Sequence, residues 1–230
     1  MEGFEPYIIK HGFKDQDFFV ATPLGRDWYD PPKPYTMLEY EWVAENIPIQ
    51  QKCVVEAGSH HGHYSMVLAS LQPYRLSLID PHSSNMDIAE VNLRLNQFLP
   101  WQLITGALWN EPGKIHYNGY SNGALISEGG REVDSYLLKD IDSKAQVVKL
   151  DIEGAEYAVV PGILKTCNID SWIIELHAGN TTEENAQDHI AQILHKHKYG
   201  LDWVNKETMR VERYKLGTIW PDHSTLFGRR

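Results

Sequence analysis

The sequence predicts an α/β fold, in which helices flank a doubly wound, mostly parallel sheet. From Cys53 onward, short apolar segments of strand length alternate with segments of helical period, which is the pattern of βαβ units. The tail, residues 201–230, carries three strand-like segments separated by turn residues. We therefore expect a closing antiparallel hairpin at one edge of the sheet. The chain length of 230 residues suits one domain, 1–230.

The expected elements follow in chain order from these patterns. The apolar runs predict strands over 53–58, 75–80, 101–108, 146–152 and 171–178. The intervening periodic segments predict helices over 64–71, 86–97, 155–164 and 183–198. In the tail, the strand-like segments are 201–205, 208–216 and 224–230.

Two segments lie outside this alternation. Residues 1–50 are rich in aromatic residues and proline and predict a helix from about Thr36, so we expect a cap or lid ahead of the catalytic core, 51–230. Its aromatic residues either cover an acceptor or pack under the helix: Trp28, Tyr29, Tyr35, Tyr40 and Trp42. The glycine-rich segment 118–130 predicts a long loop that covers a ligand.

Composition limits the possible partners. The formal net charge of −10, without clustered Lys and Arg, argues against nucleic acid. No apolar run is long enough for a bilayer, and no targeting segment is evident at the start, so we expect a soluble, cytoplasmic protein without a membrane partner. Cys53 and Cys167 lie in apolar patterns and are expected to be reduced. The sequence does not predict an oligomeric state.

The segment VVEAGSHHGHYS, residues 54–65, follows the first core strand and opens a helix. Ligands bind at this turn in open parallel sheets, and Gly58 and Gly62 allow the backbone to bend close to one. The loop also holds three histidines, His60, His61 and His63. Zinc ligands usually come as spaced pairs, so we expect these rings to pack or to form hydrogen bonds, with metal binding as the alternative.

The acids near this turn predict which ligand it takes. Glu56 precedes Gly58, and Asp80 closes the second core strand. These carboxylates would repel a pyrophosphate, and His60 replaces the middle glycine of the dinucleotide pattern. S-adenosylmethionine carries a sulfonium and no phosphate, so we expect it here, with Asp80 accepting from the ribose hydroxyls. A dinucleotide-dependent oxidoreductase is the alternative that these acids oppose.

Three segments carry a family resemblance: 54–65, 76–85 and, above all, VVKLDIEGAEYAVVPGI followed by WIIELH. They resemble the FkbM family of class I S-adenosylmethionine-dependent methyltransferases over roughly residues 50–180. That family's first motif is similar to D-x-G-A-N-x-G, where this chain has Glu56 for the aspartate and Ser59-His60 for Ala-Asn. Its second motif, K-x-D-x-E-G-x-E, is matched throughout by these residues: Lys149, Asp151, Glu153, Gly154 and Glu156. The resemblance implies a Rossmann-like seven-stranded methyltransferase sheet and methyl transfer to a hydroxyl, often of a sugar or secondary metabolite.

A second polar cluster is expected where two later strands end. Asp151 and Glu153 are two residues apart, as are Glu175 and His177, so each pair shares a face. Transfer to a hydroxyl requires a base, for which His177, oriented by a neighbour such as Glu175, is the first candidate and Asp151 the second. A rival hypothesis is that Asp151, Glu175 and His177 bind a divalent cation.

Two neighbours of this cluster have simpler interpretations. Glu156 is interpreted as an acid that favours the helix dipole, and Gly154 as a turn residue.

These inferences give a set of predicted site residues. The catalytic candidates are His177, Asp151 and Glu175. The predicted cofactor contacts are Glu56, Gly58, Ser59, His60, Gly62, Tyr64, Asp80, Pro81, Ala107 and Asp151. No metal is included, although a divalent cation stays as the rival. We expect O-methylation of a small polar acceptor between the strand ends and segment 118–130. The alternative is a module that binds S-adenosylmethionine without turnover.

Overall fold

The fold is described from a computed structural model. It describes residues 7–14, 16–22, 33–120, 123–126, 129–177, 180, 185–218, 220–221 and 224–230. Trp28 and Tyr29 of the predicted lid lie outside these residues.

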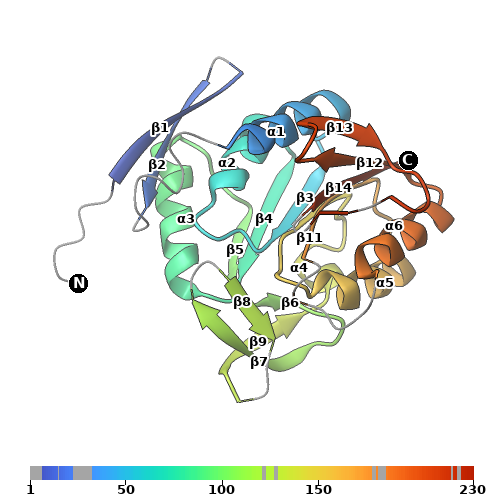
Figure 1. Cartoon of the computed structure of the whole chain (residues 1–230). Coiled ribbons are helices and arrows are strands. Elements are labelled where there is room, and N and C mark those ends of the chain that lie inside the picture. Colours follow the sequence, from blue (N-terminus) through green and yellow to red (C-terminus); the bar gives the residue numbers. More distant parts are fainter. Residues whose placement is uncertain are drawn as a thin grey trace.

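A large sheet forms the centre of the molecule, with strand order β13-β12-β14-β11-β10-β3-β4-β5 (Figure 1). Its parallel strands are β3 (Cys53–Ala57), β4 (Arg75–Asp80), β5 (Gln102–Thr105), β10 (Val147–Leu150) and β11 (Ser171–Leu176). They match four of the five strands predicted within the alternating region, whereas the fifth, 101–108, is divided at Gly106 into β5 and a short strand of a second sheet. Because β3 lies between β4 and β10, the winding reverses beside β3, which is where such sheets bind ligands.

The helices cover both faces of this sheet (Figure 1). One face packs against α1 (Pro34–Asn46), α2 (His63–Ser70) and α3 (Ser83–Leu95), and the other against α4 (Leu138–Ile141), α5 (Glu156–Thr166) and α6 (Ala186–Lys196). Alternate residues of each strand enter the two cores, so that Val54 and Ile173 pack on the first face while Val55 and Ile174 pack on the second. The doubly wound prediction is confirmed.

The tail forms the closing antiparallel strands that were predicted. They are β12 (Gly200–Asn205), β13 (Arg210–Arg213) and β14 (Ser224–Arg229). Strand β14 lies between β11 and β12 and is antiparallel to both, while β13 pairs with β12 at the edge. The large sheet therefore has eight strands in the described part of the chain, one more than the resemblance implied, and β13 is the additional edge strand.

A second sheet lies beyond the carboxyl end of β5, and it includes part of segment 118–130, which was predicted as a loop. Its strands are β6 (Ala107–Leu108), β7 (Gly113–Tyr120), β8 (Gly123–Ile126) and β9 (Arg131–Tyr136), in the order β6-β9-β7-β8. Segment 118–130 therefore contains the paired ends of β7 and β8, and the loop prediction is wrong over that part. The glycines concealed the strands, because a β-ribbon tolerates them at its turns.

Residues 1–50 contain a hairpin that the sequence did not predict. Strands β1 (Tyr7–Phe13) and β2 (Gln16–Thr22) pair with each other and lie beside α3 (Figure 1). The amide of Asn92 on α3 both donates to and accepts from the backbone of Ala21, at 3.0 and 2.6 Å. Asn96 does the same with the backbone of Phe19. Two helix side chains thereby complete the open edge of β2.

Helix α1 begins at Pro34, close to the predicted start, and packs on the sheet. Its Tyr40 is 1% exposed and Trp42 stacks on Phe227 with ring centroids 4.2 Å apart. For these two aromatic residues, packing under the helix is the role that the structure shows. None of the helices in the described residues combines the length and apolar character needed to cross a membrane. Cys53 and Cys167 are both free thiols.

Candidate functional site

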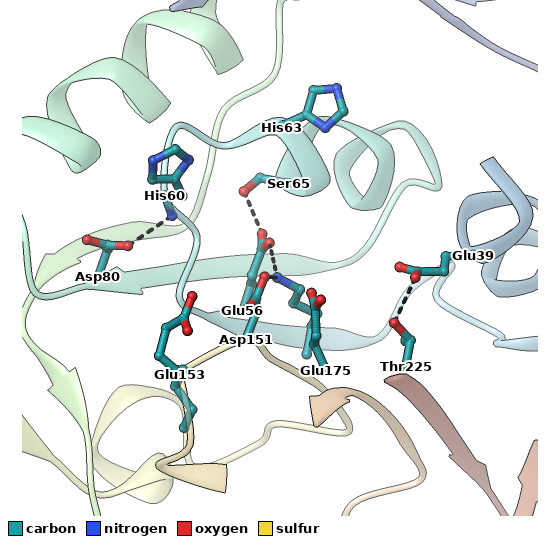
Figure 2. Close-up of polar contacts among 12 residues, drawn as sticks. Glu39, Glu56, His60, His63, Ser65, Asp80, Asp151, Glu153, Glu175 and Thr225 are labelled. Carbon is teal, nitrogen blue, oxygen red and sulfur yellow. Dashed lines mark hydrogen bonds and ion pairs between the residues drawn. The ribbon is translucent and has the colours of Figure 1, made fainter. Parts of the chain in front are cut away.

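Most of the predicted site residues lie at the carboxyl ends of the central strands (Figure 2). The carboxylates of Glu56 in β3, of Asp151 directly after β10 and of Glu175 in β11 lie near one another in this view. Parallel strands bring their carboxyl ends to one edge, so residues distant in the sequence meet there. The two predicted clusters, one after β3 and one after β10 and β11, therefore form one continuous polar region.

The loop between β3 and α2 is bent by three residues with left-handed backbone: Gly58 (φ 77°), His60 (φ 48°) and Gly62 (φ 74°). At Gly58 a side chain is excluded, because a Cβ atom would lie 1.7 Å from the carbonyl oxygen of Asp151. At Gly62 a Cβ atom would lie 3.1 Å from Ala89 of α3. Gly58 thus lets the ends of β3 and β10 approach, and Gly62 lets α2 start against α3.

Asp80 ties this loop to the end of β4. Its carboxylate accepts from the backbone N–H groups of His60 and His82 at 3.0 and 2.9 Å and from the amide of Asn85 at 3.0 Å. Burial raises the pKa of Asp80, and the three hydrogen bonds oppose that rise. Figure 2 shows the contact with His60. Asp80 therefore has a structural role in shaping the loop beside its predicted role with a ribose.

The three loop histidines do not gather around a common point. The rings of His60 and His61 stack with centroids 3.8 Å apart, and Nδ1 of His63 forms a 2.7 Å hydrogen bond with the hydroxyl of Tyr40. Burial lowers the pKa of His60 to about 4 and that of His61 to about 3. Packing and hydrogen bonding, the role expected for these side chains, is what the structure shows.

Glu56 is fully buried and forms an ion pair inside the sheet. Register places Lys149 of β10 directly beside it, and the Nζ atom of Lys149 lies 3.5 Å from Oε1 of Glu56 and 3.1 Å from Oδ2 of Asp151. Ser65 donates to the other oxygen of Glu56 at 2.5 Å. Burial alone would lower the pKa of Lys149, but Asp151 and Glu56 raise it above its ordinary value. The Glu56 carboxylate therefore faces Lys149 and Ser65 within the core.

His177 follows β11 and stands among carboxylates from the β10–α5 turn. Its Nδ1 lies 3.1 Å from Oε1 of Glu156, and its Nε2 lies 3.5 Å from Oδ1 of Asp151 and 3.7 Å from Oε2 of Glu153. Burial lowers its pKa, but the hydrogen bond and the charge of Glu156, together with the charges of Asp151 and Glu175, raise it to about 9. Glu156, rather than Glu175, is thus the residue that orients His177.

Glu156 does more than the predicted favourable contact with a helix dipole. It is the first residue of α5 and is fully buried. Its two carboxylate oxygens accept from the backbone N–H groups of Ile152 and Gly154, both at 2.8 Å. Gly154 has φ 97°, which agrees with its predicted turn role. Glu156 therefore holds the turn that presents Asp151 and Glu153.

Glu175 and Glu39 add two acids on the α1 side of the site. Glu175 lies in β11, 3.9 Å from Nζ of Lys206, and burial together with Asp151 raises its pKa to about 7. Glu39 of α1 accepts from the hydroxyl of Thr225 at 2.7 Å, as Figure 2 shows. Burial raises the pKa of Glu39 to about 8, and repulsion from Glu175 adds to the rise. The cap helix thus contributes an acid to the site.

The remaining predicted cofactor contacts surround the β3–α2 loop. Ser59 is 3% exposed and its hydroxyl faces the sulfur of Met86. The ring of Tyr64 lies 5.1 Å from Nζ of Lys149 and packs edge-on against Tyr40. Pro81 follows β4 and accepts from the hydroxyl of Tyr117 through its carbonyl, and Ala107 begins β6. The structure brings these positions to the same edge of the sheet as Asp80.

Three residues with evident roles were missed or underrated from the sequence. Lys149 was quoted only as part of a motif, although a lysine inside the apolar strand VVKL indicates a buried partner. Glu153 was placed in the cluster without a role. Glu39 gave no signal, because its helix carries polar residues around much of its surface.

The residues present fit S-adenosylmethionine better than a pyrophosphate coenzyme. The β3–α2 loop contains no Lys or Arg, and the nearest described cation of the site, Lys149, is already paired with Glu56 and Asp151. Asp80 offers carboxylate oxygens at the end of β4, where a ribose diol binds in nucleotide folds. This donor set suits a nucleoside with a positively charged substituent.

Comparison with known families gives a match over part of the chain. Residues 107–201 match the family model described as the methyltransferase FkbM domain. This segment runs from β6 through β12 and includes the K-x-D-x-E-G-x-E motif at the end of β10. The resemblance to the FkbM family is confirmed by this match. No curated protein matches the sequence.

Solved structures share the fold at low sequence identity. The crystal structure of methyltransferase FkbM from Methylobacillus flagellatus KT superimposes with a TM-score of 0.53 and 15% identity over 85% of this chain and 48% of that chain. Magnesium protoporphyrin IX methyltransferase from Synechocystis PCC 6803, solved with bound SAM, gives 0.54 and 13% over 91% and 86%. The chain therefore has the Rossmann-like class I methyltransferase fold, and it spans about half the length of the FkbM structure.

Proposed function

Given an FkbM domain match on a class I methyltransferase fold, we propose that this protein is an S-adenosylmethionine-dependent methyltransferase that methylates a hydroxyl of a small polar acceptor. The observation that carries the proposal is the position of the K-x-D-x-E-G-x-E motif. Its Asp151 leaves the end of β10 directly beside the β3–α2 loop, where the Gly58 backbone meets it. The predicted cofactor loop and the predicted reaction groups thus adjoin.

The cofactor side of the site is formed by the ends of β3 and β4. Asp80 is positioned to accept from ribose hydroxyls while its remaining contacts hold the loop at His60. Gly58 and Gly62 have left-handed backbone conformations, which let the β3–α2 loop turn close to the strand ends. When bound, the cofactor supplies an electrophilic methyl group on a sulfonium.

The reaction forms one bond and breaks one bond. An oxygen of the acceptor attacks the methyl carbon, the carbon–sulfur bond breaks with its electron pair left on sulfur, and the hydroxyl proton leaves to a base. The protein's part is to align the acceptor oxygen and to accept that proton. A direct displacement needs no other co-reactant.

Exposure distinguishes the groups that can touch the acceptor. The side chains of Asp151 and Glu175 are 30% and 29% exposed, whereas that of His177 is 3% exposed behind Asp151. Either carboxylate is therefore placed to take the proton, and His177 is a positioning residue that acts through Asp151. This order differs from the expectation that His177 is the base, because Glu156 holds its Nδ1 and carboxylates surround its Nε2.

The proposal is tested by incubating the protein with S-adenosylmethionine carrying a labelled methyl group and a panel of sugars, hydroxylated acids and phenols. We expect a labelled product with one of them, and loss of turnover in whichever of Asp151→Asn and Glu175→Gln removes the base, while the exposed-acid control Asp87→Asn retains it. Binding of S-adenosylhomocysteine without any product across the panel would favour the module that binds the cofactor and lacks turnover. Undiminished turnover in both site variants would contradict the assignment of the base.

A further inference from the structure

The side chains of Asp151, Glu153 and His177 converge with one potential ligand atom each, and these three atoms lie within 4.8 Å of one another. Among the described residues, this is the group of three such side chains that can surround a cation. It differs from the set that the sequence suggested, because Glu153 takes the place of Glu175. The turn between β10 and α5 brings Glu153 back over the strand end.

The imidazole of His177 is oriented as in a metal-binding histidine. It is 2% exposed, so its direction is fixed by packing. Nδ1 is held by the buried Glu156 carboxylate at 3.1 Å, and Nε2 points between Asp151 and Glu153. Metal-bound histidines almost always donate their second ring nitrogen to a carboxylate or carbonyl, which fixes the tautomer that presents the other nitrogen.

The charges around the cluster favour a cation. Three carboxylates face His177, namely those of Asp151, Glu153 and Glu156, and Glu56 shares Lys149 with Asp151, so that four carboxylates stand against the two cations Lys149 and His177. The Nζ atom of Lys149 contacts Oδ2 of Asp151, whereas the Nε2 atom of His177 faces Oδ1 of the same carboxylate. Even with His177 protonated, negative charge is in excess. Concentrated, buried negative charge is costly unless a further positive charge enters.

From this arrangement we infer that Asp151, Glu153 and His177 form a binding site for a divalent transition-metal cation. One imidazole with two carboxylates suits Mn²⁺ or Zn²⁺ better than Mg²⁺, which prefers oxygen ligands alone. Glu156 is then the residue that positions His177. The side chains of Asp151 and Glu153 are 30% and 26% exposed, so a cation can reach the site from solvent.

The role of such a cation rests on the proposed function. A cation held here would lie beside the carboxyl end of β10 and would bind the acceptor hydroxyl, which lowers the pKa of that hydroxyl. Asp151 would then be a ligand, and Glu175 would be the carboxylate that remains to take the proton. Metal binding itself can be measured without any turnover.

The test is a titration of the metal-free protein with Mn²⁺. Binding is measured by electron paramagnetic resonance as the decrease of the free Mn²⁺ signal, and Zn²⁺ and Mg²⁺ are then added as competitors. We expect one equivalent to bind, with Zn²⁺ competing better than Mg²⁺. His177→Ala, Asp151→Asn and Glu153→Gln should each weaken binding by at least about tenfold, as should the positioning variant Glu156→Gln. Glu90→Gln, an exposed acid on α3, is the matched control and should bind as the parent does.

Each sample is also titrated with S-adenosylhomocysteine, and its thermal unfolding is recorded. Glu153→Gln is the decisive variant, because the Glu153 side chain is partly exposed and its replacement leaves the backbone contacts of Glu156 in place. Absence of Mn²⁺ and Zn²⁺ binding in protein that binds S-adenosylhomocysteine would overturn the metal site and leave the proposed function standing. Equal metal binding in the parent and in folded Glu153→Gln and His177→Ala would also overturn it. Metal binding without S-adenosylhomocysteine binding would contradict the proposed function instead.

Discussion

Lys149 of β10 lies 3.5 Å from Glu56 of β3 across two neighbouring parallel strands, with both side chains buried in the sheet. The pair links the second motif of the sequence to the first. Because Lys149 also contacts Asp151 at 3.1 Å, a single cation holds together the carboxylates of the cofactor side and of the reaction side. We therefore expect the contacts of Lys149 with these two carboxylates to be needed both for the stability of the protein and for the geometry of the site.

Replacing Lys149 by Met should lower the free energy of unfolding by about 3–5 kcal/mol, because Glu56 would be left buried without its partner. Urea unfolding measures this change. The double variant Glu56→Gln with Lys149→Met should lose less than the sum of the two single variants. Lys114→Met, which removes an exposed ion pair on β7, should leave the urea midpoint unchanged. Additive losses in the double variant would show that the pair is not coupled.

Gly58→Ala should prevent the ends of β3 and β10 from meeting. The new Cβ atom would lie 1.7 Å from the carbonyl oxygen of Asp151, and the left-handed backbone alone costs about 1–2 kcal/mol for a residue with a side chain. We expect a large fall in the unfolding midpoint and loss of S-adenosylhomocysteine binding in calorimetry. Gly162 lies within α5, and a Cβ atom there would have the side chain of Asn110 at 3.9 Å, so Gly162→Ala should gain about 0.5–1 kcal/mol. Parent-like stability of Gly58→Ala would contradict the close approach.

Glu39→Gln should change the pH dependence of stability. The folded state raises the pKa of Glu39 from 4.5 to about 8, so it binds more protons than the unfolded state between these values. Its contribution to stability is present below pH 4.5 and is lost as pH rises towards 8, by up to about 1.4 kcal/mol for each pH unit. Gln retains the oxygen that accepts from Thr225 but does not titrate.

The parent and Glu39→Gln should therefore have similar stability at low pH, and the variant should become the more stable of the two as pH rises to 8. Urea unfolding series at several pH values test this. A constant difference between the two proteins over that range would exclude a raised pKa at Glu39.

Asp80→Asn should weaken S-adenosylhomocysteine binding by about tenfold to a hundredfold, because a hydrogen bond to a charged group contributes about 1.5–3 kcal/mol. Isothermal titration calorimetry gives the affinity. Thermal unfolding shows whether the loss of the Asp80 contact with the backbone of His60 has destabilised the fold, so that this effect is distinguished from a lost contact with the ligand. Asp87→Asn, an exposed acid on α3, serves as the control. An unchanged affinity in folded Asp80→Asn would remove Asp80 from the cofactor site.

The central sheet was predictable because its parallel strands are short apolar runs, and each of them except β5 is followed by a periodic helix. The segment that forms β3 and α2 and the segment that forms β10 and α5 both gave this signal. The β1–β2 hairpin gave none, since the side chains that complete its edge, Asn92 and Asn96, lie about seventy residues away on α3. The second sheet was missed because glycines within 118–130 favoured a loop.

The candidate site was predictable in its place and only partly in its contacts. Strand ends follow from the sequence, so Asp80, Asp151 and His177 could be assigned to one edge. Which carboxylate faces which cation depends on register and on the start of α5, and neither is encoded locally. For this reason Glu156 was identified as a dipole residue, although its side chain contacts His177 and two backbone amides.

The central claim is that this edge of the sheet accepts an adenosyl-sulfur compound and not a pyrophosphate coenzyme. The direct measurement is isothermal titration calorimetry of the parent protein with S-adenosylhomocysteine and, separately, with NAD. The account predicts saturable binding of one equivalent of S-adenosylhomocysteine and no heat of binding with NAD. Tight binding of NAD with none of S-adenosylhomocysteine would contradict it.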